Sequence, residues 1–303
     1  MAILTNAWES YSSVGNREDL IDVITNISPT EAWFTSNTGS VRAISKYHEW
    51  QTDTLAAAAA NAQYEGNVIT ATAQTATKRV GNYTQILTKS FAVTDTEQAI
   101  DTAGGANKVD YLTAKNMKML ANDIEYALVI NSTQASGATG TARTMYGVLG
   151  YIATNYATGA TGTGTGSLTE TLFNNCLQNI WAAGGYPSTA LVGAFQKRLI
   201  SDWTTNTRNV QADAKKLTAA VDVYQSDFGT VAIRLHHILN TNAAGTIIIL
   251  GDMDLWKKAW LRPVKKEELA RTSLARLFVI SAELTLESRQ EAGSGKVYNL
   301  TTS

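Results

Sequence analysis

The sequence predicts an α+β fold that carries long extensions. A helical pattern of apolar residues spans residues 107–134, strands and helices are mixed over residues 167–250, and apolar residues alternate with polar ones over residues 278–287. Most of residues 1–94, in contrast, lacks regularly spaced large apolar residues. We therefore expect the first third of the chain to extend away from the folded body.

Residues 1–43 are predicted to form an N-terminal arm. A few aromatic residues, among them Trp8 and Trp33, are separated by Ser, Asn, Thr and Gly, and only residues 19–27 have an amphipathic pattern. These apolar residues are too scattered for the arm to fold by itself. It needs a surface on which to lie.

Residues 44–95 are predicted to form one long β-hairpin. Its outgoing limb is residues 44–54, its small and flexible tip is residues 56–67, and its returning limb is residues 68–94. At about 3.3 Å per residue, a limb of roughly 20 residues reaches about 65 Å. A two-stranded hairpin of this length is only marginally stable in water when it is isolated.

The returning limb has one short apolar face. Leu87, Phe91 and Val93 point the same way because side chains alternate along a strand. The rest of the limb is mainly Thr, Ala, Val and Gln. We therefore expect the hairpin to pack on another subunit rather than on its own.

Residues 96–166 are predicted to contain the longest helix, over residues 107–134. Leu120, Ile124 and Leu128 recur at helical spacing. A glycine-rich loop closes this region, and it lacks the Gly-Lys-Ser/Thr ending of a phosphate-binding loop.

Residues 167–250 are predicted to form a compact α+β domain. Ser167 and Glu170 have the spacing of a capping box, and Leu172, Cys176 and Ile180 form the inner face of the helix that follows. Further strands and one helix are expected at residues 190–192, 195–203, 221–223 and 231–235.

Residues 251–303 are expected to return to β structure. The alternation over residues 278–287 indicates a strand with one buried face, and residues 297–300 are expected to pair back on it.

Composition argues for a subunit covered by neighbours. Of 303 residues, 44% are hydrophobic and only 17% are charged, against about 25% charged in typical soluble domains. The net charge of -1 provides no basic field that would attract nucleic acid. No stretch approaches about 18 apolar residues, so no membrane partner is expected.

The sequence offers no catalytic, cofactor or metal site. The three histidines are His48, His236 and His237, and the last two are expected to point to opposite faces of a strand, where they cannot share a metal ion. Cys176 lies on an apolar helix face and is expected in the core. An enzyme or glycan-binding domain would need a pocket of convergent polar groups, and no motif predicts one.

Several short segments, in this order and spacing, resemble the HK97-fold major capsid proteins of tailed bacteriophages, in particular a short, podovirus-like branch. They are residues 49–53 (EWQTD), 81–86 (GNYTQI), 184–187 (GGYP), 195–197 (FQK) and 221–229 (VDVYQSDFG). The order of arm, hairpin, long helix, α+β domain and final strands resembles that family over essentially the whole chain.

The resemblance implies a division of the chain. The expected parts are an N-terminal arm (1–43), an E-loop hairpin (44–95), a peripheral domain with a spine helix (96–166), an axial domain (167–250) and the return strands of the peripheral domain (251–303).

The resemblance also implies a structural role and no enzymatic activity. The subunit would assemble with itself into hexamers and pentamers of an icosahedral head, located in the virion after assembly and in the host cytoplasm before it. Further expected partners are portal and scaffolding proteins, a decoration protein, and packaged double-stranded DNA bound without sequence specificity. The alternative is an encapsulin-like shell that packages protein, and neighbouring genes would distinguish the two.

Candidate interface residues lie along the hairpin and its continuation. They are Trp50, Asp53, Tyr64, Arg79, Asn82, Tyr83 and Lys89.

Overall fold

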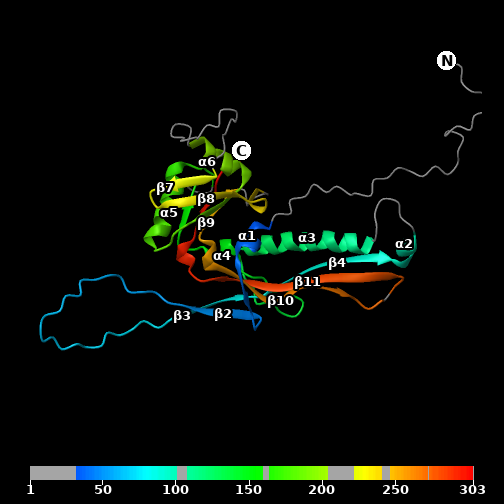
Figure 1. Cartoon of the computed structure of the whole chain (residues 1–303), viewed down its shortest axis with the longest axis horizontal. Helices are drawn as coiled ribbons and strands as arrows, with labels where there is room; N and C mark the ends of the chain where they lie inside the picture. Colours follow the sequence, from blue (N-terminus) through cyan, green and yellow to red (C-terminus); the bar gives the residue numbers. More distant parts are fainter. Residues whose placement is uncertain are drawn as a thin grey trace, which may run out of the picture.

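A long sheet with a helix along it, a second sheet at one end and a projecting loop make up the molecule (Figure 1). This computed structural model describes residues 32–100, 108–159, 164–203, 222–240, 246–271 and 273–302. Most of the predicted arm, residues 1–31, lies outside the described residues.

The long sheet has four strands from both ends of the chain, in the order β1-β10-β11-β4. The first pair is parallel and the other two pairs are antiparallel. The strands are β1 (Gly39–Arg42), β4 (Gln85–Thr94), β10 (Trp256–Glu268) and β11 (Ala275–Ser288). The short helices near it are α1 (Trp33–Asn37), α2 (Asp95–Ala99) and α4 (Val148–Tyr151).

The predicted long helix is α3 (Lys108–Val129), which lies along this sheet (Figure 1). Its residues Leu120, Ile124 and Leu128 are buried in one apolar cluster with Leu284 and Leu286 of β11. Full burial of one such side chain contributes about 1.5–3 kcal/mol, so this cluster fixes the helix on the sheet. The helix ends five residues before the predicted end at residue 134.

The expected return limb of the hairpin is divided between two sheets, which corrects the prediction. Only β2 (Tyr47–Thr52) and β3 (Lys78–Tyr83) form a two-stranded ribbon. β4 instead pairs along its whole length with β11. Leu87 and Phe91 of β4 pack against the apolar cluster of its own subunit, which is why this part of the limb needs no neighbour.

The strand predicted at residues 278–287 is part of β11, and its buried face is as expected. Phe278, Ile280 and Leu284 are all buried. The opposite face is buried as well from Glu283 to Ser288, where a half-exposed face was expected. The ribbon crosses β11 there, since Trp50 of β2 donates a hydrogen bond to the carbonyl of Ser288.

The second sheet has six strands in the order β5-β12-β9-β6-β8-β7. They are β5 (Tyr156–Thr158), β6 (Thr189–Val192), β7 (Val223–Ser226), β8 (Gly229–Leu235), β9 (Ile248–Gly251) and β12 (Gly295–Tyr298). Helices α5 (Glu170–Ala182) and α6 (Ala194–Trp203) accompany them. Single-turn helices at Ile238–Asn240, Met253–Leu255 and Glu291–Gly293 complete the described elements.

The second sheet is buried on both faces at its centre. Ala190 and Val192 of β6 pack into the cluster that includes Phe173 and Ile180 of α5, whereas Leu191 faces the cluster of the long helix. This two-sided burial explains why β6 and β9 are apolar at successive positions instead of alternating. It also joins the two sheets into one packed body.

The structure differs from three sequence-based predictions: the extent of the second sheet, the pairing of its last strand and the cap of α5. β5 and β12 lie outside residues 167–250 but belong to the six-stranded sheet, and β12 pairs with β9 and β5 rather than with β11. The reason is apolar burial, since Val297 and Leu300 are core residues of that sheet. The cap of α5 is Thr169, whose hydroxyl accepts a hydrogen bond from the amide of Leu172 at 3.2 Å, and not Ser167.

Candidate assembly interface

The ribbon of β2 and β3 is held against its own subunit. Trp50 Nε1 donates a 2.8 Å hydrogen bond to the carbonyl of Ser288, and the Trp50 ring lies 6.1 Å from that of Tyr151. His48 Nε2 lies 3.2 Å from a carboxylate oxygen of Glu287. Trp50 was a candidate for the interface between subunits, and the structure places its indole nitrogen on its own β11.

Asn82 makes more hydrogen bonds to the body of the subunit than Trp50 or His48 does. Its side chain is 0% exposed, donates to the carbonyls of Tyr146 and Leu286 at 2.9 Å, and accepts the Tyr146 amide at 2.9 Å. The side-chain amide thus makes three bonds within the subunit. The Asn82 side chain is thus bonded within its own subunit, and its interface role stays a prediction.

Tyr83 and Lys89 also face their own subunit. The centroid of the Tyr83 ring lies 4.6 Å from that of Tyr47 across the ribbon, and the two rings are tilted by 47°. Gly81 beside them leaves room for Tyr47, whose ring would lie 2.7 Å from a β-carbon at this position. Lys89 Nζ of β4 lies 2.6 Å from Asp123 of α3. These two candidates therefore stabilise the ribbon and the helix, and neither is a free surface side chain.

The remaining candidates lie beyond the docked part of the ribbon. Arg79 forms an exposed 3.6 Å ion pair with Glu49, of a kind that contributes only about 0–1 kcal/mol. Asp53 is exposed and accepts the amide of Thr54 at 2.8 Å. Tyr64 is 74% exposed. These three remain available to a neighbouring molecule.

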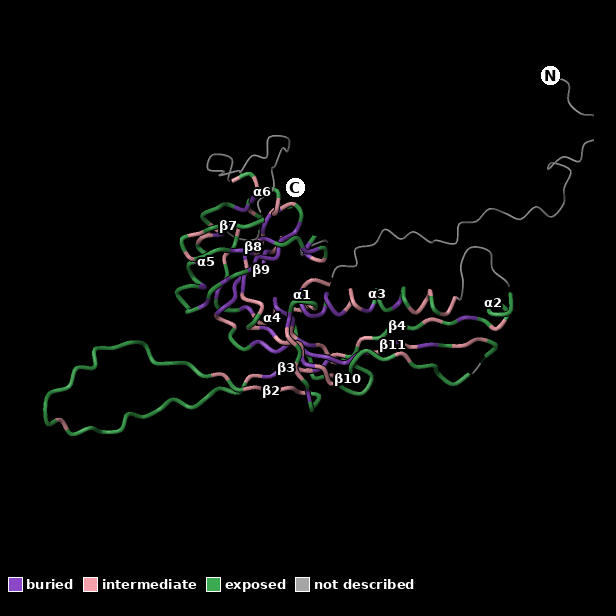
Figure 2. Tube along the Cα trace, viewed as in Figure 1, coloured by how far each residue is buried: buried purple, intermediate pink, exposed green. Residues whose placement is uncertain are grey.

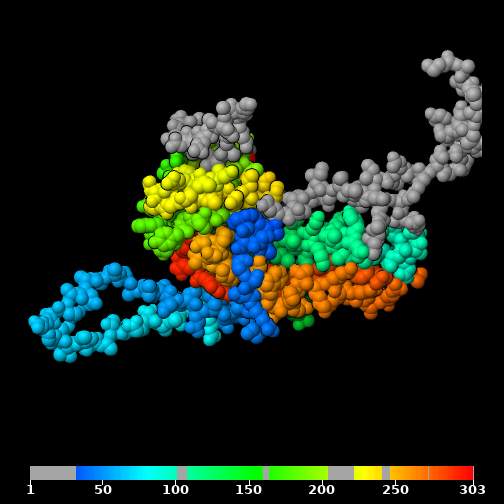
Figure 3. All heavy atoms as spheres, viewed as in Figure 1, coloured from blue at the N-terminus to red at the C-terminus, as the bar shows by residue number. Residues whose placement is uncertain are grey.

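Residues 53–77 form a projecting loop without helix or strand (Figures 1 and 2). Every residue is exposed except Asn67, which is intermediate. The loop carries four exposed large side chains, of which only Tyr64 was among the candidates predicted from the sequence. They are Leu55 (99%), Tyr64 (74%), Val68 (83%) and Ile69 (88%). Figure 3 shows the loop standing clear of the body.

A second buried attachment joins α1, α3 and the end of β8. The Glu125 carboxylate accepts the amides of Phe34 at 2.6 Å and Thr35 at 2.7 Å, and His236 Nε2 lies 2.7 Å from it. Burial raises the pKa of Glu125, but the hydrogen bonds from His236 and Thr35 outweigh it and hold the pKa below its usual value. His236 thus has the structural role expected of it.

The described residues include no reactive thiol and no cluster of metal ligands. Cys176 is buried in the core, and burial raises the pKa of its thiol to about 12. Within the described ranges, no three His, Cys, Asp or Glu side chains gather as metal ligands would. In the same ranges, none of the helices has both the length and the apolar character needed to cross a bilayer.

Comparison of the sequence with models of known protein families identifies the family of this chain. The model of the SU10 major capsid protein family matches residues 5–301. The chain belongs to this family of phage major capsid proteins. As a major capsid protein it is a structural component of the phage head and not an enzyme, and its place is the virion capsid.

Solved structures from phages and from a GTA particle share the fold of this major capsid protein at low sequence identity. A chain from Microbacterium phage Oxtober96 matches with a TM-score of 0.63 and 11% identity, covering 94% of this chain and 95% of that one. The capsid of a native GTA particle matches at 0.60 and 13%, covering 96% and 97%. The mature capsid of bacteriophage PhiM1 matches at 0.60 and 11%, covering 100% and 97%. No curated protein sequence matches the chain.

Proposed function

We propose that this major capsid protein assembles through its projecting loop into hexamers and pentamers of an icosahedral head with the HK97 fold. The observation that carries the proposal is the exposure of residues 53–77, where four large apolar side chains have no partner in their own subunit. Burial of such side chains is favourable at about 25 cal/mol per Å². A second copy of the chain is the partner that a self-assembling shell always provides.

The parts of the fold take the corresponding roles in this proposal. Residues 53–77 with the ribbon β2–β3 form the E-loop, and α3 is the spine helix. The four-stranded sheet with α3 is the peripheral domain. The six-stranded sheet, including β5 and β12, is the axial domain, whose outer tip meets its copies at the centre of each ring.

The head so formed would enclose double-stranded DNA without reading its sequence. The net charge of -1 gives the subunit no overall basic field, so we expect its contacts with DNA to be few and independent of sequence. Portal, scaffolding and decoration proteins are the further partners of such a head. We also propose that the chain belongs to the short, podovirus-like branch and that it stays in the host cytoplasm until it assembles.

Deletion of residues 56–67 tests the proposal. We expect the deletion variant to fail to form shells in electron micrographs of the purified protein, while the wild type forms closed particles. Its thermal unfolding should match that of the unassembled wild type, because the removed residues are exposed. Normal shells from the variant would contradict the role of the loop. Shells that contain a protein cargo and no DNA would instead favour the encapsulin-like alternative.

A further inference from the structure

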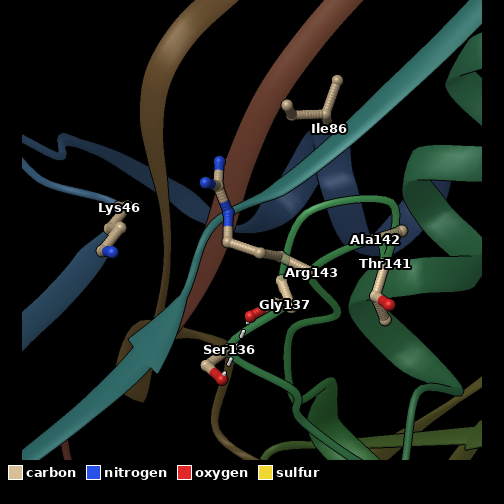
Figure 4. A pocket seen from close by; sticks show the side chains of 8 residues that line it. Lys46, Ile86, Ser136, Gly137, Thr141, Ala142 and Arg143 are labelled. Carbon is tan, nitrogen blue, oxygen red and sulfur yellow. Dashed lines mark hydrogen bonds between the residues drawn. The ribbon is translucent and has the colours of Figure 1, made fainter.

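A cleft beside the start of the ribbon has the features of a receptor for an acidic and apolar segment. Its volume is about 320 Å³, and its walls come from the turn before β2, the start of β4 and the loop after α3 (Figure 4). The side chains that decide its character are Lys46, Ile86, Ser136, Thr141 and Arg143.

Positive charge dominates this cleft. Arg143 lies 2.5 Å from the buried carboxylate of Glu283, and Arg262 lies 2.9 Å from the other oxygen of the same carboxylate. One acid therefore faces two guanidinium groups. The ammonium group of Lys46 adds a further charge and has no hydrogen-bond or ion-pair partner among the residues that the structure describes. Lys46 and Arg143 are the charged residues that line the cleft, and Lys46 is the one without an acidic partner in the described part of the chain.

One exposed apolar residue lines the same cleft, and a second lies nearby in the sequence. Ile86 lines it with 48% of its surface exposed, although its neighbours in β4 alternate into the core. Ile44, two residues before Lys46, is 89% exposed. Large exposed apolar side chains rimmed by polar residues are typical of a surface that a partner covers.

The projecting loop has the complementary character. Its only charged residues are Asp53 and Glu65, so the loop is purely acidic. Glu65 follows the exposed Tyr64 in a turn that the amide of Asn67 closes by a 3.2 Å hydrogen bond to the Tyr64 carbonyl. The tip of the loop thus presents one carboxylate beside large apolar side chains.

The loop of the same subunit does not fill the cleft. β2 runs from Tyr47 to Thr52, so Lys46 lies at one end of the ribbon and the loop leaves from the other. Figure 1 shows the loop extending away from the body on that side. A loop that enters the cleft must therefore come from a second copy of the chain.

We propose that the cleft around Lys46 and Arg143 receives the loop tip, Tyr64 and Glu65, of a second copy. This inference rests on the proposed assembly function and names the surface that the loop recognises. Glu65 compensates the excess positive charge, and the apolar side chains of the loop cover Ile44 and Ile86. Such charge pairing fixes register between subunits and suppresses wrong contacts.

A charge exchange tests the pairing. Lys46→Glu and Glu65→Lys should each raise the protein concentration needed for shell formation by about tenfold or more, and the double variant should recover most of that loss. Lys118→Glu is a matched control, since Lys118 is exposed on α3 away from the cleft. We expect Lys118→Glu combined with Glu65→Lys to give no recovery. Thermal unfolding of every variant checks that the subunits fold.

A cysteine pair gives an independent readout. Glu65→Cys together with Ser136→Cys should form disulfides between copies under mild oxidation of assembled shells, seen as a ladder on a non-reducing gel. The native Cys176 is buried and adds no crosslink. Wild-type shells with no recovery in the exchange and no ladder would overturn this inference and leave the assembly function intact. A wild type that forms no shells at all would overturn the proposed function itself.

Discussion

The ribbon β2–β3 and the loop that it carries differ in how they are held, although both belong to the segment expected as one hairpin. The ribbon is attached by Trp50 and Asn82, whose polar atoms bond to the backbone of its own subunit. The loop has no such attachment and exposes almost every side chain. An extended segment of low apolar content thus stays on its subunit only where buried polar side chains hold it.

Buried polar side chains also hold α1, the first described helix, on the subunit. Five residues are too few for a stable isolated helix. Two of its backbone amides donate to the buried Glu125, and Lys258 donates to the carbonyls of Thr35 and Thr38. Buried polar attachments therefore separate segments that are fixed within the subunit, such as α1 and the ribbon, from the loop of residues 53–77.

Removal of Glu125 is expected to have the largest effect on the free energy of unfolding. Glu125→Ala leaves His236 and two backbone amides buried without an acceptor, which should lower that free energy by about 3–5 kcal/mol. Urea unfolding of the subunit at low concentration measures it. A decrease in the free energy of unfolding of less than about 1 kcal/mol, the range of an ordinary neutral hydrogen bond, would mean that Glu125 does not hold α1 in place.

Acid should weaken the same attachment. The pKa of Glu125 is lower in the folded subunit than its usual value of 4.5. Its contribution is therefore complete above the unfolded value and is lost as the pH falls below about 4.5 toward the folded pKa. Glu125→Gln retains His236 and Lys258, so only the carboxyl differs. The stability gap between the wild type and this variant should close as the solution is acidified. A constant gap would contradict the sign of the shift.

Substitution of Asn82 is expected to have an intermediate effect on the free energy of unfolding. Asn82 holds the ribbon, so this variant tests directly whether the ribbon and the loop differ. Asn82→Ala removes three hydrogen bonds and leaves the part-buried Tyr146 amide without its acceptor, at a cost of about 2 kcal/mol. Asn61→Ala is the matched control, because Asn61 is exposed in the loop. If Asn82→Ala impaired shell formation without lowering the stability of the subunit, Asn82 would be an interface residue after all.

Local patterns predicted the strands and helices well but not their partners. The alternation of Leu87, Phe91 and Val93 correctly indicated a strand with one apolar face. The sequence could not say that β11, almost 200 residues later, would pair with it, because a period of two fixes a face and not a neighbour. The same limit explains why β12 was assigned to the wrong sheet.

The buried polar residues were the hardest to foresee. Glu125 follows Ile124 on a helix whose charged residues are otherwise exposed or half-exposed, and its partners lie 90 to 111 positions away. Asn82 likewise reaches a residue 204 positions away. Such residues resemble surface residues in the sequence, and only the folded backbone shows that donors and acceptors surround them. Asn82, a candidate for the interface, is for this reason found bonded within its own subunit.

The smallest effect on stability is expected in the loop. Ile69→Ser removes an apolar side chain that is 88% exposed, so the free energy of unfolding of the lone subunit should change by less than about 0.5 kcal/mol. The same change should weaken assembly, since the apolar contact is made only when a second copy covers the loop. Urea unfolding below the assembly concentration and light scattering above it separate the two effects. A subunit destabilised as strongly by Ile69→Ser as by Asn82→Ala would mean that the loop folds onto its own body, and the contrast between ribbon and loop would then disappear.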